Sequence, residues 1–332
     1  MVHKIKTYLA LLGWLFPGLG VAQRIDHTAS FRQLSQPTFI RLHYDNDFFR
    51  ATDYYYSQGY SIEVVHPVLR KNPLTSLLIK AKTTQAQYGL AFEHFGFTPT
   101  TIRSDVIELG DRPFAACLLL KTFSQSLDTL RRVRVSSALS TGMMGPVALG
   151  GQIQAALHRL LNGVEPRGWQ HQIRNEVLLN YSLTYEKQLF AYRHALSVSA
   201  LAQAQLGTFS DRFQTGVVVM AGRFESPFEH TPNKGRLPMQ LYVYAQPLVS
   251  VVAYDASLQG GLLNRSSPYV IAAGQLARTT LQANVGVVFS YKHLYLEYYQ
   301  SMLSREFATG QSHQWGGVKM SLSFDAFAHP TP

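Results

Sequence analysis

The sequence predicts an all-β chain: one transmembrane antiparallel β-barrel of about twelve strands, with a short helix interrupting the strand pattern. Apolar and polar residues alternate with a period of two from end to end, as in strands whose faces meet different surroundings. Aromatic residues make up 12% of the chain and charged residues only 15%, against about 25% in typical soluble domains. Beyond the N-terminal segment, no apolar run approaches the ~18 residues of a transmembrane helix. A secreted soluble β-sandwich is the alternative with the same alternation.

The N-terminus has the pattern of a bacterial export signal. Two lysines precede an apolar run from Tyr8 to Phe16, and a Pro-Gly break and small residues follow it up to Ala22. The run is well short of the ~20 residues that a membrane anchor requires. We expect residues 1–22 to be a signal peptide and residues 23–332 to form one outer-membrane barrel domain.

The predicted strands alternate between outward apolar and inward polar positions. In the first, Ile40 and Leu42 alternate with Arg41 and His43. No charge-rich linker or low-complexity segment divides the chain, which favours a single domain. The candidate strands, from which we count about twelve, are residues 39–45, 55–65, 85–95, 114–123, 131–140, 176–188, 194–206, 216–224, 240–254, 267–278, 281–291, 294–300 and 315–324.

Three segments do not have strand periodicity. Residues 74–84 fit a loop or a short amphipathic turn, and residues 98–111 fit a long polar connection. Residues 150–161 fit a helix in which Gln154 and His158, four residues apart, share a polar sector. The apolar stripe of this helix consists of Ile153, Ala156, Leu157, Leu160 and Leu161.

Charge and cysteine content exclude several classes of protein. The formal net charge is +10, but the cationic residues are dispersed rather than clustered, so nucleic acid is not expected as a partner. A phosphate-bearing lipid surface is the expected anionic partner. Cys117 is the single cysteine, so no intramolecular disulfide can form. Its apolar neighbours indicate a buried or lipid-facing side chain rather than a nucleophile.

Oxygen-bearing side chains end the first predicted strand. Asn46 and Asp47, which follow Asp45, could form part of a site for a hard cation such as Ca²⁺. Asx residues also favour simple turns through local hydrogen bonds, and this reading stays open. Ser57 carries a hydroxyl nearby, but no Gly-x-Ser-x-Gly elbow surrounds it, so a serine nucleophile has little support.

His158 is the strongest candidate for a general base. An imidazole titrates near neutral pH, and the predicted helix would hold it rigidly beside Gln154. A hydrogen-bonded structural histidine is the equally plausible alternative on the residues alone. A zinc site is not expected, because the spacing of His158 and His171 matches no helical or finger pattern.

Five motifs follow one another in residues 39–185: Asn46-Asp47; Thr52-Asp53-x-Tyr55-Tyr56-Ser57-x-Gly59; Gly110-Asp111-Arg112-Pro113-Phe114-Ala115; Gly145-Pro146-x-x-x-Gly150-x-Gln152-x-Gln154-x-x-x-His158; and Gly168-Trp169-x-x-Gln172-x-x-Asn175-Glu176. In this order they resemble the outer-membrane lipid A 3′-O-deacylases. The resemblance implies a twelve-stranded barrel with its active site between the wall and a short helix, near the outer leaflet.

The resemblance also implies an activity: Ca²⁺-dependent hydrolysis of the ester that links the 3′ acyloxyacyl chain to lipid A of lipopolysaccharide. His158 would activate water as the general base. Asn46 and Asp47 would bind Ca²⁺ or organise the oxyanion site, and Gln154 would complete the polar helix face. A cation can stabilise the charge that develops on an attacked ester carbonyl without any proton transfer.

The chain departs from the family at two positions. Ser57 stands where the family often has Thr, which keeps the hydroxyl. The family lysine before the Gly-Asp-Arg turn is missing, and Arg103 is the nearest cation able to bind a glucosamine phosphate. Glu165 is the candidate for the acidic residue expected after the helix.

Two other functions stay open at this point. A non-enzymatic outer-membrane porin or adhesin would use the same barrel, with His158 and Asn46-Asp47 merely lining the lumen. A different lipid-modifying barrel enzyme would pair Ser57 with a histidine. In each case we expect the chain to act as a monomer in the bacterial outer membrane.

Overall fold

The computed structural model describes residues 28–34, 36–50, 54–82, 85–160, 163–229 and 237–324. The predicted signal peptide and its cleavage site lie outside the described residues. So does Asp53 of the second motif. Among the described residues, no helix combines the length and the apolar character needed to cross a membrane.

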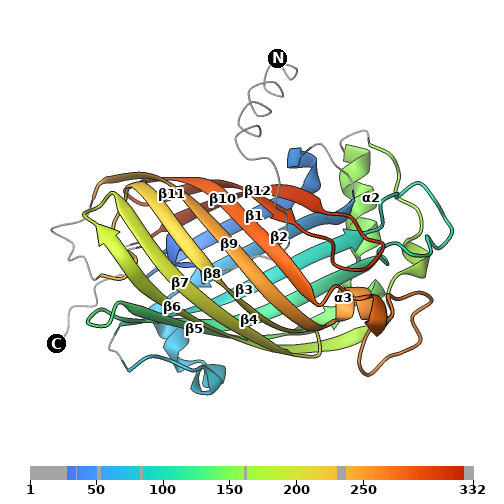
Figure 1. Ribbon diagram of the computed structural model, residues 1–332, viewed down its shortest axis with the longest axis horizontal. Helices are drawn as coiled ribbons and strands as arrows, with labels where there is room; N and C mark the ends of the chain where they lie inside the picture. The colour runs from blue at the N-terminus through green and yellow to red at the C-terminus, as the bar shows by residue number, and fades with distance from the viewer. Residues whose placement is uncertain are drawn as a thin grey trace, which may run out of the picture.

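The described strands form a closed antiparallel barrel in which each strand pairs with its neighbours in sequence and β1 pairs with β12 (Figure 1). The predicted all-β transmembrane barrel of about twelve strands is confirmed. The strands are β1 Phe39–Asn46, β2 Tyr55–Val65, β3 Ala86–Thr98, β4 Ala115–Asp128, β5 Val133–Met144, β6 Glu176–Tyr192, β7 Leu196–Gly207, β8 Ser210–Arg223, β9 Met239–Asp255, β10 Thr279–Tyr291, β11 Leu294–Leu303 and β12 His313–Ser323.

Short helical segments connect the strands. The α-helices are α2 Gly150–Leu160 and α3 Ala256–Gln259; the 3₁₀ turns are η2 Ser30–Arg32, η3 Asp47–Arg50, η4 Pro67–Lys71, η5 Pro73–Leu77, η6 Pro146–Ala148, η7 Trp169–His171 and η9 Ala273–Gln275. The predicted helix over residues 150–161 is therefore present. The strand predicted over residues 267–278 is wrong: this segment is a loop, and its apolar residues Ile271 and Leu276 pack into a small cluster with Phe307 instead.

Alternation along the strands gives the barrel an apolar outer face, as a membrane-spanning wall requires. In β1 the inward Arg41 and His43 are buried, whereas the outward Ile40 and Leu42 are exposed. Closure pairs every strand on both edges, so the wall presents no unpaired edge to lipid. Similar outward apolar residues on other strands include Ile62, Phe92, Leu120, Val177, Leu179, Val243, Val251, Met320 and Leu322.

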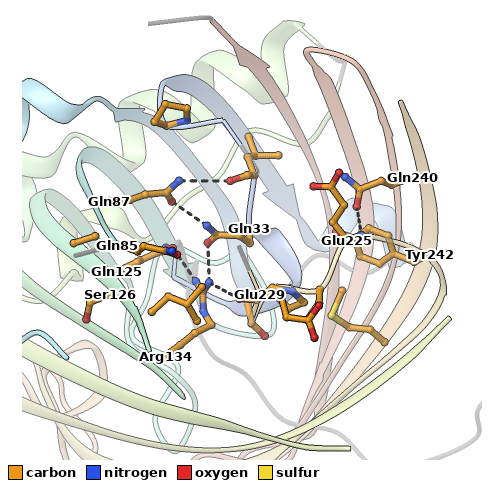
Figure 2. A pocket seen from close by; sticks show the side chains of 18 residues that line it. Gln33, Gln85, Gln87, Gln125, Ser126, Arg134, Glu225, Glu229, Gln240 and Tyr242 are labelled. Carbon is orange, nitrogen blue, oxygen red and sulfur yellow. Dashed lines mark hydrogen bonds between the residues drawn. The ribbon is translucent and has the colours of Figure 1, made fainter. Parts of the chain in front are cut away.

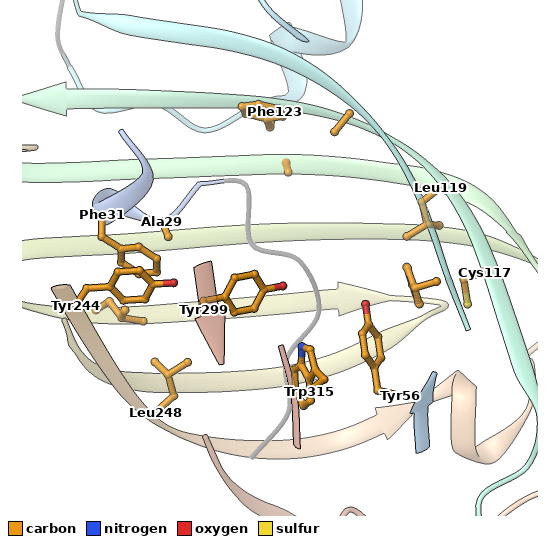
Figure 3. Close-up of a cluster of buried hydrophobic side chains, with 14 of the residues drawn as sticks. Ala29, Phe31, Tyr56, Cys117, Leu119, Phe123, Tyr244, Leu248, Tyr299 and Trp315 are labelled. Atoms are coloured by element: carbon orange, nitrogen blue, oxygen red, sulfur yellow. The ribbon is translucent and has the colours of Figure 1, made fainter. Parts of the chain in front are cut away.

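The lumen is packed with side chains, and the N-terminal segment 28–34 contributes to this core (Figure 3). The Phe31 ring stacks on Tyr244 with 3.8 Å between ring centroids. The Arg32 guanidinium forms a buried ion pair with Glu297 on β11, with 2.8 Å between Nη2 and Oε1. On another strand, β6, the Glu186 carboxylate accepts a hydrogen bond from the Ser30 hydroxyl at 2.6 Å. Two strands are thus joined through η2.

The barrel has two different ends. At the hairpin end, where β1 begins and β12 ends, a polar cavity of about 310 Å³ opens beside the N-terminal segment (Figure 2). Gln33 lies between Gln87 and Arg134 there: its Nε2 donates to the Gln87 Oε1 at 3.3 Å, and the Arg134 Nη1 donates to its Oε1 at 2.8 Å. Because these polar groups hydrogen-bond to one another, the cavity is lined by a hydrogen-bonded network and is not an open pore.

The loop end carries α2, α3 and the long connections (Figure 1). Here Arg112 of the Gly-Asp-Arg turn is buried, binds Glu306 and donates to the Ser257 hydroxyl at 2.7 Å. Burial raises the pKa of the Glu306 carboxyl above its ordinary value, although the Arg112 guanidinium acts in the opposite direction. An apolar cluster that includes Tyr55 and Leu258 adds to the packing at this end.

Candidate active site between the barrel wall and helix α2

The predicted site residues gather on the outside of the wall at the loop end. A Cβ on Gly59 would lie 2.2 Å from lumen atoms of Asp45 and Tyr56, so Gly59 faces the lumen. Its neighbour Gln58 therefore faces outward, since successive residues of a strand point to opposite faces. Across the β2–β3 ladder, Gln58 lies opposite Gly96, which has no side chain.

Helix α2 lies directly against this outer face. A Cβ on Gly150 would lie 2.4 Å from the Ala116 Cβ and 2.7 Å from the Trp169 ring, so glycine allows the helix to touch the wall. The His94 Nε2 contacts the Ala148 carbonyl oxygen at 2.9 Å, which fixes the turn before the helix. Ala116, Ala148 and Trp169 belong to a small apolar cluster separate from the lumen core.

Gly150→Ala is expected to push α2 off the wall. Overpacking of this kind costs about 1–3 kcal/mol, more than the ~1 kcal/mol that alanine gains in helix propensity over glycine. We expect lower thermal stability, measured by unfolding in detergent. Gly274→Ala is the control, because a Cβ at Gly274 meets no atom within 4 Å. An unchanged Tm in Gly150→Ala would show that the contact with Ala116 is loose.

Asn46 and Asp47 stand at the end of β1 and are buried. The Asn46 Nδ2 donates to the Ser57 carbonyl, and its Oδ1 accepts from the Phe48 amide at 2.7 Å. The Asp47 Oδ2 accepts from the Tyr54 amide at 2.6 Å. The bond from Phe48 is that of an Asx turn, whereas the bonds to Tyr54 and Ser57 reach the next strand, and both side chains are buried.

Ser57 lies at the bulge in β2, between the paired residues Tyr56 and Gln58. Its hydroxyl is buried and hydrogen-bonded to the Thr98 hydroxyl at 2.7 Å. The bulge re-aims the strand at the point where Asn46 binds the Ser57 carbonyl. The structure therefore brings Asn46, Asp47 and Ser57 together.

His158 lies near the end of α2, half-buried, with its Nδ1 2.6 Å from the Val164 carbonyl oxygen. A carbonyl can only accept, so Nδ1 carries the hydrogen and Nε2 of the neutral ring is the basic nitrogen. The sequence did not identify this orienting group, because it is a backbone atom in the turn after the helix. A histidine held in this way can take a proton through Nε2.

Gln154 occupies the buried side of α2, one turn before His158. Its Oε1 accepts a hydrogen bond from the Trp169 indole Nε1 at 2.7 Å. By contrast, Leu160 of the apolar stripe is 79% exposed. The helix thus turns its polar sector toward the wall, an arrangement suited to an apolar solvent outside the protein.

Arg103 and Glu165, the predicted substrate-binding residues, are both exposed. They lie on neighbouring loops, because the Arg167 amide donates to the Ile102 carbonyl at 2.7 Å. The His171 Nε2 is also 2.9 Å from the Asp105 carbonyl oxygen, which ties the same loops together.

The predicted site has a helix part, with His158, and a β1 part, with Asn46 and Asp47. These parts are connected through residues to which no role was assigned. No hydrogen bond or ion pair within the described ranges joins His158 to Asn46 or Asp47. Instead, a Cβ position on Gly96 lies 3.8 Å from the Trp169 ring and 3.9 Å from the Gln58 Cγ. Trp169 and Gln58 therefore lie between the helix and the β1–β2 turn. The sequence feature that could have identified Gln58 is a polar amide at a strand position that faces outward.

A family model described as outer membrane protein LpxR matches residues 9–324. The chain belongs to the LpxR family. Membership confirms the resemblance of the five motifs and the predicted location in the bacterial outer membrane. Together with the matching barrel, it supports an outer-membrane protein that modifies lipid A.

The solved structure of an LpxR protein agrees with the fold. LpxR from Salmonella typhimurium is similar to this chain with a TM-score of 0.71 and 18% sequence identity, covering 86% of this chain and all of that one. The β domain of the Bordetella autotransporter BrkA is less similar, with a TM-score of 0.44 and 8% identity over 88% of this chain and 100% of its own. No curated protein sequence matches the chain at a significant level.

Proposed function

We propose that this LpxR-family barrel is a lipid A 3′-O-deacylase that hydrolyses the ester of the 3′ acyloxyacyl chain. The observation that carries the proposal is the geometry of His158, half-buried on α2 with its Nδ1–H directed to the Val164 carbonyl. Its helix packs at Ala116 on β4, a strand whose outward face is apolar further along at Leu120. An amphipathic lipid ester can place its chains on that wall and its carbonyl near the helix.

The proposed reaction is a direct attack by water. The His158 Nε2 takes a proton as the water oxygen bonds to the ester carbonyl carbon, which gives a tetrahedral oxyanion. When the bond to the 3′ oxygen of the sugar breaks, the imidazolium returns the proton to that oxygen. The products are an acyloxyacyl carboxylic acid and lipid A with a free 3′ hydroxyl.

A serine mechanism has weaker support. The Ser57 hydroxyl is hydrogen-bonded to Thr98 rather than to a histidine, and a serine nucleophile needs a base within hydrogen-bonding reach. The Ser57→Ala variant distinguishes the two mechanisms. The water mechanism expects it to retain activity, and the serine mechanism expects it to have none.

The donor set at the end of β1 fits a hard cation such as Ca²⁺. The Asp47 carboxylate, the Asn46 amide oxygen and nearby backbone carbonyls are oxygen ligands, which Ca²⁺ prefers. Across the described ranges, no group of three or more His, Cys, Asp or Glu residues is placed to hold a metal. Backbone, water and substrate oxygens would therefore supply most of the six to eight ligands. Bound there, Ca²⁺ would stabilise negative charge on the carbonyl oxygen.

Removing Ca²⁺ with a selective chelator is expected to lower the deacylation rate by about 10²-fold, the usual loss when oxyanion stabilisation is removed. Asp47→Asn keeps an oxygen acceptor for the Tyr54 amide but removes the charge. It is expected to raise the Ca²⁺ concentration that gives half-maximal rate. Asp128→Asn, on a hairpin at the other end of the barrel, is the control. Full activity in chelator would exclude a role for the cation.

The filled lumen argues against the porin alternative. Phe31, Arg32 and their partners Tyr244 and Glu297 occupy the space that a solute would need. No feature of the described residues specifically favours an adhesin.

Incubation of the purified barrel with lipid A and Ca²⁺, followed by mass spectrometry, tests the proposal. The expected product has lost one acyloxyacyl mass and keeps its other chains. Unaltered lipid A together with ion conductance across a planar bilayer would favour a porin and contradict the proposal.

A further inference from the structure

Gln58 is an unusual buried amide. It is 1% exposed, and neither its Nε2 nor its Oε1 has a hydrogen-bond partner. Among the buried side-chain amides of the described residues, it is the one with both atoms unpaired. Native proteins leave few buried polar groups unpaired, so such a group calls for a specific explanation.

The position of Gln58 supplies that explanation. It points out of the lumen on the side of the wall that α2 covers, opposite Gly96, and the edge of the Trp169 ring lies in contact distance of the Gly96 position. On the other side of the Trp169 ring, the Gln154 Nε2 is buried and unpaired as well. Two amide donors, one on the wall and one on the helix, thus flank the same indole.

We propose that Gln58 is a substrate-binding residue of the deacylase, an inference that rests on the function proposed above. Its Nε2 donates to an ester carbonyl oxygen of the acyloxyacyl chain, held between the wall and α2. An ester offers acceptors but no donor, so the amide nitrogen is the group that recognises it. Gln58 precedes Gly59 and follows the bulge at Ser57, so the strand itself fixes its direction.

Gln58→Met tests this inference because it keeps an unbranched side chain of similar length without the amide. We expect KM for lipid A to rise by between threefold and tenfold, the loss expected for one hydrogen bond, with a smaller change in kcat. The Tm of the ligand-free variant should rise by about 2 °C or more, because the unpaired buried atoms are gone.

Gln203→Met is the matched control. Gln203 is also buried on a strand, but its Nε2 donates to the Thr184 hydroxyl at 2.8 Å. This variant should lower the Tm and leave KM unchanged. If Gln58→Met instead behaves like Gln203→Met, Gln58 is structural and the inference is overturned.

Measuring the binding of lipid A in mixed micelles distinguishes a failure of this inference from a failure of the proposed function. If the wild type binds lipid A without cleaving it and Gln58→Met binds more weakly, the deacylase proposal fails and the binding role of Gln58 stands. If the wild type cleaves lipid A and Gln58→Met leaves both KM and binding unchanged, the inference about Gln58 fails alone. Absence of any lipid A binding overturns both.

Discussion

Replacing His158 by alanine is expected to lower the rate of lipid A deacylation by about 10²–10⁴-fold, the range for loss of a positioned general base. The loss should appear in kcat, because the imidazole acts on water rather than on the bound lipid. The Tm should change little, since the ring is only half-buried and its Nδ1 contact with Val164 is made at the surface. Mass spectrometry of lipid A after timed incubation measures the rate.

His171→Ala is the matched control for this prediction. Its ring likewise contacts a backbone carbonyl, that of Asp105, at 2.9 Å on the neighbouring loop. We expect the control to keep its rate within a few-fold of wild type. Deacylation that persists in the His158 variant would remove the histidine from the mechanism.

Arg32→Ala is expected to produce the largest loss of stability, about 3–5 kcal/mol, because the buried Glu297 carboxylate would lose its guanidinium partner. The Arg32 Nε also lies 3.0 Å from both oxygens of Glu297, so the pair is extensively hydrogen-bonded. Equilibrium unfolding in urea, with the barrel in lipid vesicles, measures the change.

Arg131→Ala is the control for the Arg32 variant. Its guanidinium is 82% exposed and 4.0 Å from Asp128, so its removal should change the free energy of unfolding by less than about 0.5 kcal/mol. Equal effects in the two variants would show that the ion pair between Arg32 and Glu297 contributes nothing specific.

The strand pattern could be predicted because each strand separates lipid from a packed lumen, and this imposes a period of two. Residues 267–278 show where the argument fails. Their alternation also fits a loop that folds back over the barrel end, where Ile271 and Leu276 find apolar neighbours. Sequence periodicity reports which residues are buried, and it does not report whether a strand or a loop buries them.

Helix α2 was predicted, but the environment of its faces was not. Gln154 is buried, and Leu160 of the apolar stripe is exposed. In water this amphipathic pattern would place the apolar stripe against the protein. The pattern alone does not reveal which solvent the helix meets.

The candidate site could be assembled only in part. Asn46, Asp47 and Ser57 could each be singled out from the motifs, but the hydrogen bond between Asn46 and the Ser57 carbonyl could not. The Val164 carbonyl that orients His158 could not be predicted. Every residue carries a backbone carbonyl, so the residue type does not show which carbonyl binds a side chain. The lumen segment around Phe31 was also missed, since its contacts lie on distant strands.

The outward position of Gln58 and His158 sets how the site would meet its ligand. A lumen site samples solutes in three dimensions, whereas a site on the outer wall samples molecules that diffuse within one leaflet. The rate at which the site meets lipid A would then depend on the mole fraction of lipid A in the membrane plane. Dilution of the membrane with inert lipid would slow the reaction even when the bulk concentration of lipid A is constant. Such a site works as an interfacial one, for which other lipids of the same leaflet compete.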